Sequence, residues 1–585
     1  MAEKNQNQEI KRIIIIGGVA AGTSAAVKAR RSTDDAEIVI YENYKYISFA
    51  TCGLPYYVSG SIPSIGDLII NDVEGFEKRF NIKVRTLHEV LKIDTAAKSI
   101  KVKDLTTGTV FEDYYDKLII STGSLPVIYN EELCRAGNAF ILKTIDDAVR
   151  LKGYMAKLDK KDLNAVIIGG GYIGLELIEA FLAAGFKVTI VEKTGQILPL
   201  FDFEIIEYLE NYLADKKVGL LKNEDITGFE WLGSGVEGSN IGNAGKNAAG
   251  GNNNKCSIIT AVKTASGKVI PSDIIFIGTG TRPEVTLAEA CGLSIGESGA
   301  IKVNENMQTS DPDIYAAGDC AECTDFITGA KQPQNLAFTA NMQGRCAGYN
   351  AAGGDSIFPE SNPTSIIKVL DIELAKTGIS FRQAKKLGIN AQKIEMHSLN
   401  HAGYYPGASL IHMIIIYNGD SGTVIGFEAI GKVSVDKKLD TMAVAIKCRM
   451  KISELAYLNL GYHPAYGSAK DPLNIAGMIG ENTGKGELES IDIEDLKNKI
   501  AAGEQMTILD VRSKREYESG HIENAINIPL DTLRENILLL DKGSTIFVHC
   551  RTSYRSYLAY RILKNAGFSN VKNINGSYLS FLKKL

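Results

Sequence analysis

Residues 165–192 read AVIIGGGYIGLELIEAFLAAGFKVTIVE, and this stretch decides the fold of the chain. A short apolar strand is followed by a glycine turn, a helix-length segment and a second strand that ends at Glu192. This order is typical of a doubly wound parallel sheet. Gly169, Gly171 and Gly174 match the pattern G-x-G-x-x-G, which predicts a dinucleotide-binding loop.

The loop also predicts which nucleotide binds. Gly169 and Gly171 let the backbone approach a pyrophosphate, Gly174 lets helix and strand pack closely, and the helix N-terminus supplies N–H groups. Glu192 follows Gly174 by 18 residues, where a carboxylate accepts hydrogen bonds from a ribose 2′-OH and repels a 2′-phosphate. The motif therefore favours NADH, while the neighbouring Lys193 leaves NADPH open. A plain strand–helix turn without a nucleotide is the alternative.

A second copy of the unit begins the chain. Residues 11–22, KRIIIIGGVAAG, precede a helix-length segment, and Val19 stands where the second glycine of the motif is expected. Two nucleotide sites in one chain suggest FAD as the second dinucleotide. Two later segments fit, STGS at 121–124 and IYAAGD at 314–319, where a carboxylate after a strand is suited to a ribityl hydroxyl. With Gly280, the further cofactor residues predicted are Gly17, Gly22, Glu42, Thr122, Gly123 and Asp319.

Composition limits the classes of protein. The 585 residues predict about four domains. Apolar residues make up 45% and charged residues 23%, which excludes a wholly disordered chain, a collagen and a disulfide miniprotein. The net charge of −5 favours neither nucleic acid nor anionic lipid. Nine irregularly spaced cysteines, a polar N-terminus and no membrane-length apolar run indicate a cytoplasmic protein with no membrane partner.

Together the four nucleotide segments resemble the two-dinucleotide-binding flavoprotein disulfide reductases, over residues 10–475. The reactive centre is then expected in SFATCGLPYY, residues 48–57. Members with a local redox disulfide have C-x4-C here, but position 47 is Ile47, so Cys52 stands alone. A lone thiolate cycles through a mixed disulfide, a persulfide or a sulfenate. This resembles the single-cysteine branch: coenzyme A-disulfide reductases, and NADH oxidases and peroxidases.

The oxidases and peroxidases of that branch carry a histidine in the first glycine loop, where this chain has Ala20. Disulfide or persulfide reduction is therefore favoured. The segments NHAGYYPG (400–407) and GYHPAY (461–466) resemble the coenzyme A-disulfide reductases specifically. The resemblance implies that Tyr404 and Tyr462 reach the active-site sulfur of the other subunit of a homodimer, where a phenol can stabilise a departing thiolate. His463 resembles the catalytic His-Pro of glutathione reductases, or the match is accidental.

The same resemblance implies a coenzyme A site. Residues of the first helix and of the cysteine loop bind the phosphates and the pantetheine arm in that family. The matching positions here are Ala20, Lys28, Arg31, Ser48 and Phe49. For Lys28 and Arg31, a solvated helix face is the alternative.

The last 95 residues carry a second sulfur motif. Cys550-Arg551-Thr552-Ser553-Tyr554-Arg555 follows an apolar strand and precedes a helix. Amides of such a loop and the helix dipole lower a thiol pKa and stabilise a persulfide. With DVR at 510–512 and GHI at 520–522, this resembles the rhodanese sulfurtransferases, whose loop is C-x4-R, here Cys550 to Arg555. The ending Asn575-Gly576-Ser577-Tyr578 departs from the family's Gly-Gly-x-x-x-Trp.

Cys320 and Cys323 form a CxxC without a second pair or a histidine cluster, so no metal is predicted. A redox role and a structural role are both open for this pair.

The predicted fold class is α/β, with two Rossmann-like domains for FAD and NAD, an α+β dimerisation domain and a C-terminal α/β rhodanese domain. The predicted ranges are 1–150 and 270–335 for FAD, 151–269 for NAD(P)H with a Gly/Asn-rich insertion at 233–255, 336–476 for dimerisation, 477–490 for a linker and 491–585 for the rhodanese domain.

The predicted function is reduction of CoA disulfide, CoA persulfide or polysulfide by NAD(P)H and FAD through Cys52, with sulfane sulfur carried on Cys550. An NADH oxidase or peroxidase and a redox-sensing flavoprotein of low turnover are the alternatives.

Overall fold

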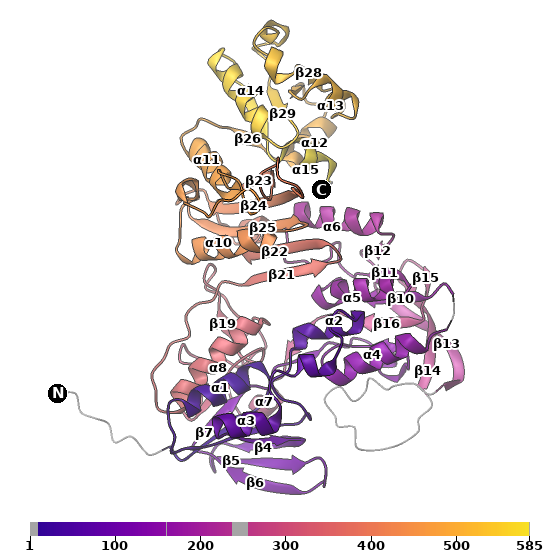
Figure 1. The fold of residues 1–585 in the computed structure, drawn as a ribbon, viewed down its shortest axis with the longest axis vertical. Coiled ribbons are helices and arrows are strands. Elements are labelled where there is room, and N and C mark those ends of the chain that lie inside the picture. Colours follow the sequence, from indigo (N-terminus) through magenta and orange to yellow (C-terminus); the bar gives the residue numbers. More distant parts are fainter. Residues whose placement is uncertain (1–9, 160, 237–255, 584–585) are drawn as a thin grey trace, which may run out of the picture. The chain divides into compact units, whose positions relative to one another are not determined.

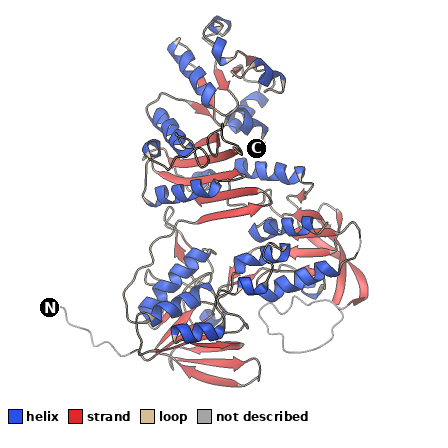
Figure 2. Ribbon diagram, in the orientation of Figure 1, coloured by secondary structure: helices blue, strands red, loops and turns tan. Residues whose placement is uncertain are grey.

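The computed structural model describes residues 10–159, 161–236 and 256–583, which divide into two compact units (Figure 1). Unit 1 comprises residues 1–197 and 218–363, and unit 2 comprises residues 198–217 and 364–585. Within both units, helices pack on central sheets (Figure 2). This confirms the predicted α/β class. The insertion predicted at 233–255 lies largely outside the described residues.

The first glycine loop belongs to a parallel sheet of unit 1. Its strands, in spatial order, are β18 (Ile314–Ala316), β7 (Lys117–Ile120), β1 (Arg12–Ile16), β2 (Glu37–Glu42) and β3 (Lys83–Thr86). The isoleucines of β1 are buried, as expected of a parallel strand covered on both faces. Val90 and Val102, from an antiparallel sheet of β4 (His88–Asp94), β5 (Ser99–Asp104) and β6 (Val110–Tyr114), join the same core.

The second glycine loop belongs to another parallel sheet of unit 1. Its order is β12 (Gly219–Leu221), β11 (Lys187–Val191), β10 (Asn164–Ile168), β16 (Ile274–Ile277) and β9 (Ala139–Phe140). The predicted division at 150 and 270 is therefore displaced at both ends, because β9 and β16 pair in this sheet. An apolar strand such as β16 does not carry in its sequence the identity of the strand with which it pairs.

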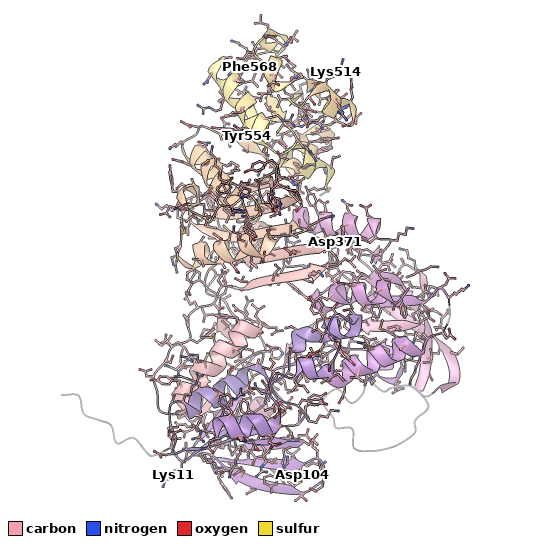
Figure 3. All side chains as sticks on the ribbon, in the orientation of Figure 1. Lys11, Asp104, Asp371, Lys514, Tyr554 and Phe568 are labelled. Atoms are coloured by element: carbon pink, nitrogen blue, oxygen red, sulfur yellow. The ribbon has the colours of Figure 1, made fainter. Side chains whose placement is uncertain are left out.

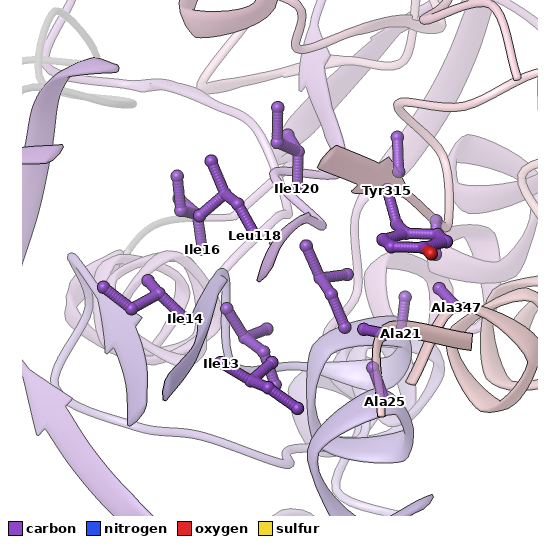
Figure 4. Close-up of a cluster of buried hydrophobic side chains, with 14 of the residues drawn as sticks. Ile13, Ile14, Ile16, Ala21, Ala25, Leu118, Ile120, Tyr315 and Ala347 are labelled. Atoms are coloured by element: carbon purple, nitrogen blue, oxygen red, sulfur yellow. The ribbon is translucent and has the colours of Figure 1, made fainter. Parts of the chain in front are cut away.

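Helix α8 (Ala337–Ala351) corrects a further boundary, since residues 336–363 were expected in the dimerisation domain. The helix packs lengthwise on α1 (Ala20–Arg30) of unit 1. Gly344 lies against the Ala21 carbonyl and Gly348 against the Ala25 carbonyl. Figure 4 shows Ala21 and Ala25 beside Ala347 in this core. Small residues on both helices allow this close approach.

Unit 2 contains the antiparallel sheet of the dimerisation domain. Its order is β21 (Thr364–Val369), β22 (Ile372–Gly378), β25 (Val424–Gly431), β24 (Leu410–Asn418) and β23 (Ala391–Leu399). Helix α10 (Val435–Lys447) packs on β22 and β25. Helix α6 (Phe203–Asp215), expected in the NAD(P)H-binding domain, also packs on β25. The Asp202 amide donates to Glu428 at 2.8 Å, and the Asp202 carboxylate accepts the Phe381 amide at 2.6 Å.

Unit 2 also contains the rhodanese domain, a parallel sheet in the order β26 (Ser490–Ile491), β30 (Val571–Ile574), β29 (Ile546–His549), β27 (Thr507–Asp510) and β28 (Ile526–Asn527). Its helices are α12 (Ile493–Ala501), α13 (Lys514–Glu518), α14 (Tyr554–Asn565) and α15 (Ser577–Leu582). The linker expected at 477–490 is helical up to Gly484, within α11 (Pro472–Gly484). Gly477 and Gly480 let α11 lie close to the 3-10 helix at Ile452–Tyr457.

The α-helices and strands not yet named belong to unit 1, apart from α9. The helices are α2 (Leu54–Ser59), α3 (Val73–Phe80), α4 (Ile145–Lys157), α5 (Tyr172–Ala183) and α7 (Thr286–Ala290), and α9 (Phe381–Lys386) belongs to unit 2. The strands are β13 (Ile226–Val236), β14 (Cys256–Thr264) and β15 (Val269–Pro271) in one sheet, and the pairs β8 (Ser124–Pro126) with β17 (Thr281–Pro283) and β19 (Cys323–Thr324) with β20 (Lys331–Gln332).

The contact between α1 and α8 predicts a large effect of a single methyl group. Gly348→Ala places a Cβ on the Ala25 carbonyl, and should destabilise the protein by about 1–3 kcal/mol through overpacking. Gly153→Ala in α4 is the matched control, because a Cβ there meets no atom within 4 Å. It should be neutral, or stabilising by about 0.5–1 kcal/mol. Thermal unfolding of both variants measures the difference, and equal Tm values would contradict the packing described.

Candidate active sites

The loop between β1 and α1 has no room for side chains at its first and last glycines. Gly17 adopts φ +101°, and a Cβ there would collide with the Ser121 carbonyl. A Cβ at Gly22 would collide with the Gly17 carbonyl. The N-cap residue of α1, Val19, makes no side-chain capping bond, so the first amides of the helix are left for an anionic ligand. The loop fits the FAD pyrophosphate predicted for it.

The carboxylate after the second strand of each glycine unit holds its own glycine loop. Glu42 accepts the Gly18 amide at 2.6 Å and the Tyr44 amide at 2.9 Å. Glu192 accepts the Gly170 amide at 2.7 Å. Burial raises the pKa of Glu42, and the amide hydrogen bonds oppose that rise. The sequence predicted a ribose contact for Glu192 and a cofactor-binding role for Glu42, but it did not predict this second role, which stiffens the loop that receives the nucleotide.

The other predicted FAD residues gather at one edge of the first sheet. Thr122 and Gly123 follow β7, and Asp319 follows the adjacent strand β18. The Ser124 hydroxyl donates to Asp319 at 2.9 Å, which joins the two loops. Gly17 follows β1, the other neighbour of β7. Nucleotides bind at this carboxyl edge of open α/β sheets. Gly280 lies apart from this group, after β16 of the second sheet, and adopts φ +94°.

The second glycine loop has the same close packing. Gly169 adopts φ +93°, and a Cβ at Gly174 would lie 2.8 Å from the Ile167 side chain. Gly171 is the N-cap of α5 and offers no side-chain capping bond. Lys193 forms an ion pair with Asp225 at 2.8 Å. The basic residue that left NADPH open therefore has a carboxylate partner.

Cys52 is an exposed thiol in a short 3-10 helix, Thr51–Gly53, that leads into α2. Gly53 and Leu54, which follow it, are buried and anchor the turn. Ile47, at the position of the missing partner cysteine, is buried. A Cβ at Gly18 would lie 2.8 Å from the Ile47 side chain, so position 47 packs against the first glycine loop. This turn therefore presents one sulfur to solvent.

Tyr56 and Glu176 form a pair near Cys52 that sequence reasoning missed. The Tyr56 hydroxyl, four residues after Cys52, donates to the Glu176 carboxylate at 3.2 Å. Glu176 lies in α5, two residues after Gly174. Burial raises the pKa of Glu176 to about 7, and the hydrogen bond from Tyr56 opposes that rise. A carboxyl group with such a shifted pKa is typical of functional sites. The only sequence signal is a charged residue in the apolar run of α5.

Two basic candidates for coenzyme A lie at the C-terminal end of α1, Lys28 within the helix and Arg31 as its C-cap. The Lys28 ammonium lies 4.3 Å from the centroid of the Tyr349 ring on α8. The Arg31 guanidinium donates to the Val27 carbonyl at 3.3 Å and is exposed. Ala20 begins the same helix. The cation–π contact gives Lys28 a structural role in addition to the predicted one.

The other two candidates for coenzyme A lie in the cysteine loop. The Ser48 hydroxyl accepts a hydrogen bond from the Asn71 amide at 3.0 Å. Phe49 is buried and stacks edge-on with Tyr44 at 5.7 Å. Both side chains therefore support the loop that carries Cys52, and their contact with coenzyme A remains a prediction.

Tyr404 and Tyr462 come together in unit 2, although 58 residues separate them. Their hydroxyls are 3.1 Å apart, and 76% and 51% of the two residues is exposed. The hydrogen bond with Tyr462 raises the pKa of Tyr404. His463 is exposed and its Nδ1 accepts the Ala465 amide at 3.2 Å. Two phenols on one surface make a hydrogen-bonding pair suited to a ligand from outside unit 2.

Cys550 is buried at the end of β29, where its sulfur accepts the Ser553 amide at 3.2 Å. Ser553 adopts φ +89° and is the N-cap of α14. The predicted anion-binding loop is therefore present, with one amide directed at the sulfur. Tyr554, the first residue of α14, is 70% exposed (Figure 3).

Arg555 and Glu516 orient each other beside this loop. Two N–H···O contacts of 2.7 Å join them, and this hydrogen bonding lowers the pKa of Glu516.

Deeper in the domain, Arg512 and Asp510 form a buried ion pair at 2.6 Å. Burial lowers the pKa of His549 to about 4, so the imidazole next to Cys550 is neutral at physiological pH.

The CxxC pair is part of the core. Cys320 and Cys323 are buried, and burial raises the pKa of both thiols, that of Cys323 to about 11. High pKa values disfavour the thiolate that redox chemistry requires. Among the described residues, no group of three or more His, Cys, Asp or Glu side chains could hold a metal ion.

Comparison with known proteins identifies the class. The chain matches the family model of the pyridine nucleotide-disulphide oxidoreductases over residues 11–344, the dimerisation domain of that family over 364–472, and a rhodanese-like domain over 492–584. The chain belongs to the pyridine nucleotide-disulphide oxidoreductases, enzymes that use FAD and NAD(P)H. Its further domains give it the order of the coenzyme A-disulfide reductase–rhodanese fusions, which confirms the resemblance inferred from the sequence.

Two solved structures are similar along nearly the whole chain. Reduced Bacillus anthracis CoADR-RHD is 35% identical, with a TM-score of 0.90 and 98% of each chain covered. An NAD-dependent persulfide reductase from A. fulgidus is 34% identical, with a TM-score of 0.86 and coverage of 97% of this chain and 99% of that one. An NADH oxidase of Methanocaldococcus jannaschii is 32% identical over 466 residues, which are 80% of this chain and 97% of that protein.

Within the part of the chain that the structure describes, no helix combines the length and the apolar character that crossing a membrane requires.

The pairing of Lys193 with Asp225 predicts a preference for NADH. Glu192 repels a 2′-phosphate and Lys193 is engaged, so we expect kcat/KM to be at least tenfold higher with NADH than with NADPH. Asp225→Asn should lower the ratio of kcat/KM with NADH to kcat/KM with NADPH, because it releases Lys193 from the ion pair. Asp162→Asn, which breaks the exposed ion pair of Lys187 with Asp162 at 2.9 Å in the same unit, is the control. Steady-state kinetics with both nucleotides test this, and a wild-type preference for NADPH would contradict it.

Proposed function

We propose that the chain uses NADH to reduce disulfide or persulfide sulfur, in coenzyme A disulfide, coenzyme A persulfide or polysulfide, and that Cys52 is the attacking thiolate. The observation that carries this proposal is the exposed thiol of Cys52, which stands alone in its loop because buried Ile47 occupies the partner position. A lone thiol must form a bond with the substrate rather than with a neighbouring cysteine. The reducing chemistry and the free thiols favour the cytoplasm.

In the proposed reaction, the Cys52 thiolate attacks one sulfur of the substrate, the S–S bond breaks, and the other sulfur leaves as a thiolate. Tyr404 and Tyr462 donate hydrogen bonds to that thiolate, as a close pair of phenols can. FAD, held by the first glycine loop with Thr122, Gly123 and Asp319, would supply the two electrons that return the Cys52 mixed disulfide to a thiolate, and NADH would supply them to FAD as hydride. Overall, NADH, one proton and the disulfide give NAD+ and two thiols.

The rhodanese loop supports a persulfide or polysulfide as the working substrate. We propose that Cys550 carries sulfane sulfur, with the Ser553 amide and the adjacent helix N-terminus stabilising the negative sulfur. Arg555, oriented by Glu516, contributes positive charge beside the loop. Coenzyme A would bind near Lys28 and Arg31, at the C-terminal end of α1.

NADH oxidation by oxygen or peroxide is the second candidate, favoured by the similarity to the M. jannaschii NADH oxidase. Ala20 in the first glycine loop argues against it, because the oxidases of the resembled branch carry histidine there. A low-turnover redox sensor is the third candidate. NADH consumption measured under air, and anaerobically with coenzyme A persulfide, separates the three. NADH consumption that is faster under air than with coenzyme A persulfide would favour the oxidase. No NADH consumption in either condition would favour the sensor.

The two sulfur sites should fail differently when they are changed. Cys52→Ser should abolish reduction of every sulfur substrate, while NADH still bleaches the flavin. Cys550→Ser should leave reduction of coenzyme A disulfide nearly intact, and should abolish thiosulfate:cyanide sulfur transfer. Cys448→Ser, at an exposed thiol outside both motifs, is the control. Loss of coenzyme A disulfide reduction in Cys550→Ser as complete as in Cys52→Ser would overturn the assignment of two sites.

We further propose a homodimer in which Tyr404 and Tyr462 of one subunit serve Cys52 of the other. A heterodimer of Cys52→Ser and Tyr462→Phe chains would then contain one intact site. Its activity should be about half that of the wild-type dimer, well above either parent homodimer. Tyr457→Phe, at another exposed tyrosine of the same unit, is the control and should keep full activity. Heterodimer activity no higher than that of the parents would contradict crossed subunits.

A further inference from the structure

The ending of the rhodanese domain differs from the family pattern Gly-Gly-x-x-x-Trp at two positions. Asn575 replaces the first glycine and Ser580 replaces the tryptophan. Both polar residues are buried. Both make hydrogen bonds outside the rhodanese domain, to strand β23 of the dimerisation domain, which belongs to the same compact unit. Figure 1 shows α15 beside β23.

Asn575 pairs with the backbone of β23 as a neighbouring strand would. The Glu395 amide donates to the Asn575 Oδ1 at 2.9 Å, and the Asn575 Nδ2 donates to the Lys393 carbonyl at 3.3 Å and to Asp492 at 2.9 Å. Strand β23 is at the edge of its sheet, so these backbone groups have no strand partner. Gly576 allows the approach, because a Cβ there would overlap the Ser580 hydroxyl.

Ser580 continues the contact one turn further along. Its hydroxyl lies 2.9 Å from His397 Nε2. The Tyr208 hydroxyl donates to the Leu579 carbonyl at 3.0 Å and lies 3.1 Å from the same histidine nitrogen. The His397 ring stacks on His412 at 4.5 Å. These groups are buried, and burial lowers the pKa of both histidines, so hydrogen bonds between neutral groups form the centre of the contact.

Charged groups surround this centre. Glu395 accepts from His412 at 2.9 Å, and that hydrogen bond helps to lower the pKa of the Glu395 carboxyl. Lys393 is paired with Glu204 of α6 and with Asp492 of the rhodanese domain. An isolated buried charge would be costly, but each of these ions has a partner across or beside the contact. The charged groups around the contact are therefore paired.

The same short segment also holds the sulfur-carrying loop. The Tyr578 amide donates to the Cys550 carbonyl at 3.1 Å, and the Leu579 amide donates to the Arg551 carbonyl at 3.2 Å. The Ser577 hydroxyl accepts the Cys550 amide at 3.4 Å. One face of α15 thus contacts β23 while its first amides contact the loop.

We propose that Asn575 and Ser580 dock the rhodanese domain on the β23 edge of this chain's own dimerisation domain, and that α15 positions the Cys550 loop through this docking. Asn575, Ser580 and His397 are positioning residues, since they act on Cys550 through α15. The inference does not depend on which sulfur compound is the substrate. It also implies that the rhodanese domain is held by a fixed contact rather than by the flexible linker expected from residues 477–490.

Hydrogen–deuterium exchange of the full-length holoenzyme, resolved to single residues, tests the docking. In Asn575→Gly/Ser580→Ala, the Glu395 amide loses its acceptor and should exchange at least tenfold faster than in the wild type. The Ile394 and Met396 amides point the other way, towards β24, and should be unchanged. Asn570→Gly/Ser569→Ala changes the same residue types at exposed positions of the same domain, and should leave all three amides unchanged.

Alkylation of Cys550 by iodoacetamide, followed by mass spectrometry from pH 6 to 9, tests the positioning. Cys550 is 1% exposed, and undocking should raise its alkylation rate at least threefold and shift the pH profile, while the control pair matches the wild type. Wild-type exchange at Glu395 in the double variant would overturn the docking. Faster exchange with an unchanged alkylation profile would overturn the coupling to Cys550. If the double variant fails to fold, Asn575→Gly alone removes the Glu395 contact and is judged by the same exchange measurement.

Discussion

Direct contact of backbone with backbone at the glycine loops is the constraint on which both nucleotide sites depend. Gly17 lies against the Ser121 carbonyl, and Gly169 lies against the Gly278 carbonyl. In each case the two loops follow adjacent parallel strands, so a Cβ at the glycine would push apart the edge at which the nucleotide binds. The carboxylates of Glu42 and Glu192 then hold these loops through single amides. Contacts of the loop backbone therefore fix both the position and the rigidity of each glycine loop.

The two cysteines that we propose as sulfur centres differ in the exposure of their thiols. Cys52 is exposed, on a turn whose next residues are buried, so the thiol can reach a substrate while the backbone is anchored. Cys550 is buried and its sulfur accepts a loop amide, an arrangement suited to storing sulfur rather than to attacking a bulky disulfide. Tyr56 and Glu176 connect the turn of Cys52 to the helix of the second nucleotide loop. Burial, more than residue type, separates the two roles that we propose.

Unit 2 contains many polar groups in its interior. Lys376 and Glu428 form a buried ion pair at 2.6 Å, and Lys438 pairs with Asp471. Buried ion pairs add little net stability, but removing one partner leaves an uncompensated charge. Such pairs therefore restrict which helices and sheets can pack together. The contact of the rhodanese domain with β23 also restricts which elements can pack together. At its centre, Asn575 bonds to the Glu395 amide and Ser580 bonds to His397.

The sequence by itself determined the class of fold, both glycine loops, the lone cysteine of the 48–57 loop and the rhodanese loop, because each depends on residues close together in the chain. Local spacing of Gly169, Gly171 and Gly174 is enough to predict the turn, and at Gly169 a positive φ and the nearby Gly278 carbonyl leave no room for a side chain. Only the tertiary structure decided that β16 joins the second sheet, that α8 packs on α1 and that α11 replaces a linker. The hydrogen bonds of Tyr56 with Glu176, and of Asn575 with β23, belong to this second group. These two hydrogen bonds join residues more than a hundred positions apart, and no local pattern of polarity records which distant partner a buried polar side chain will meet.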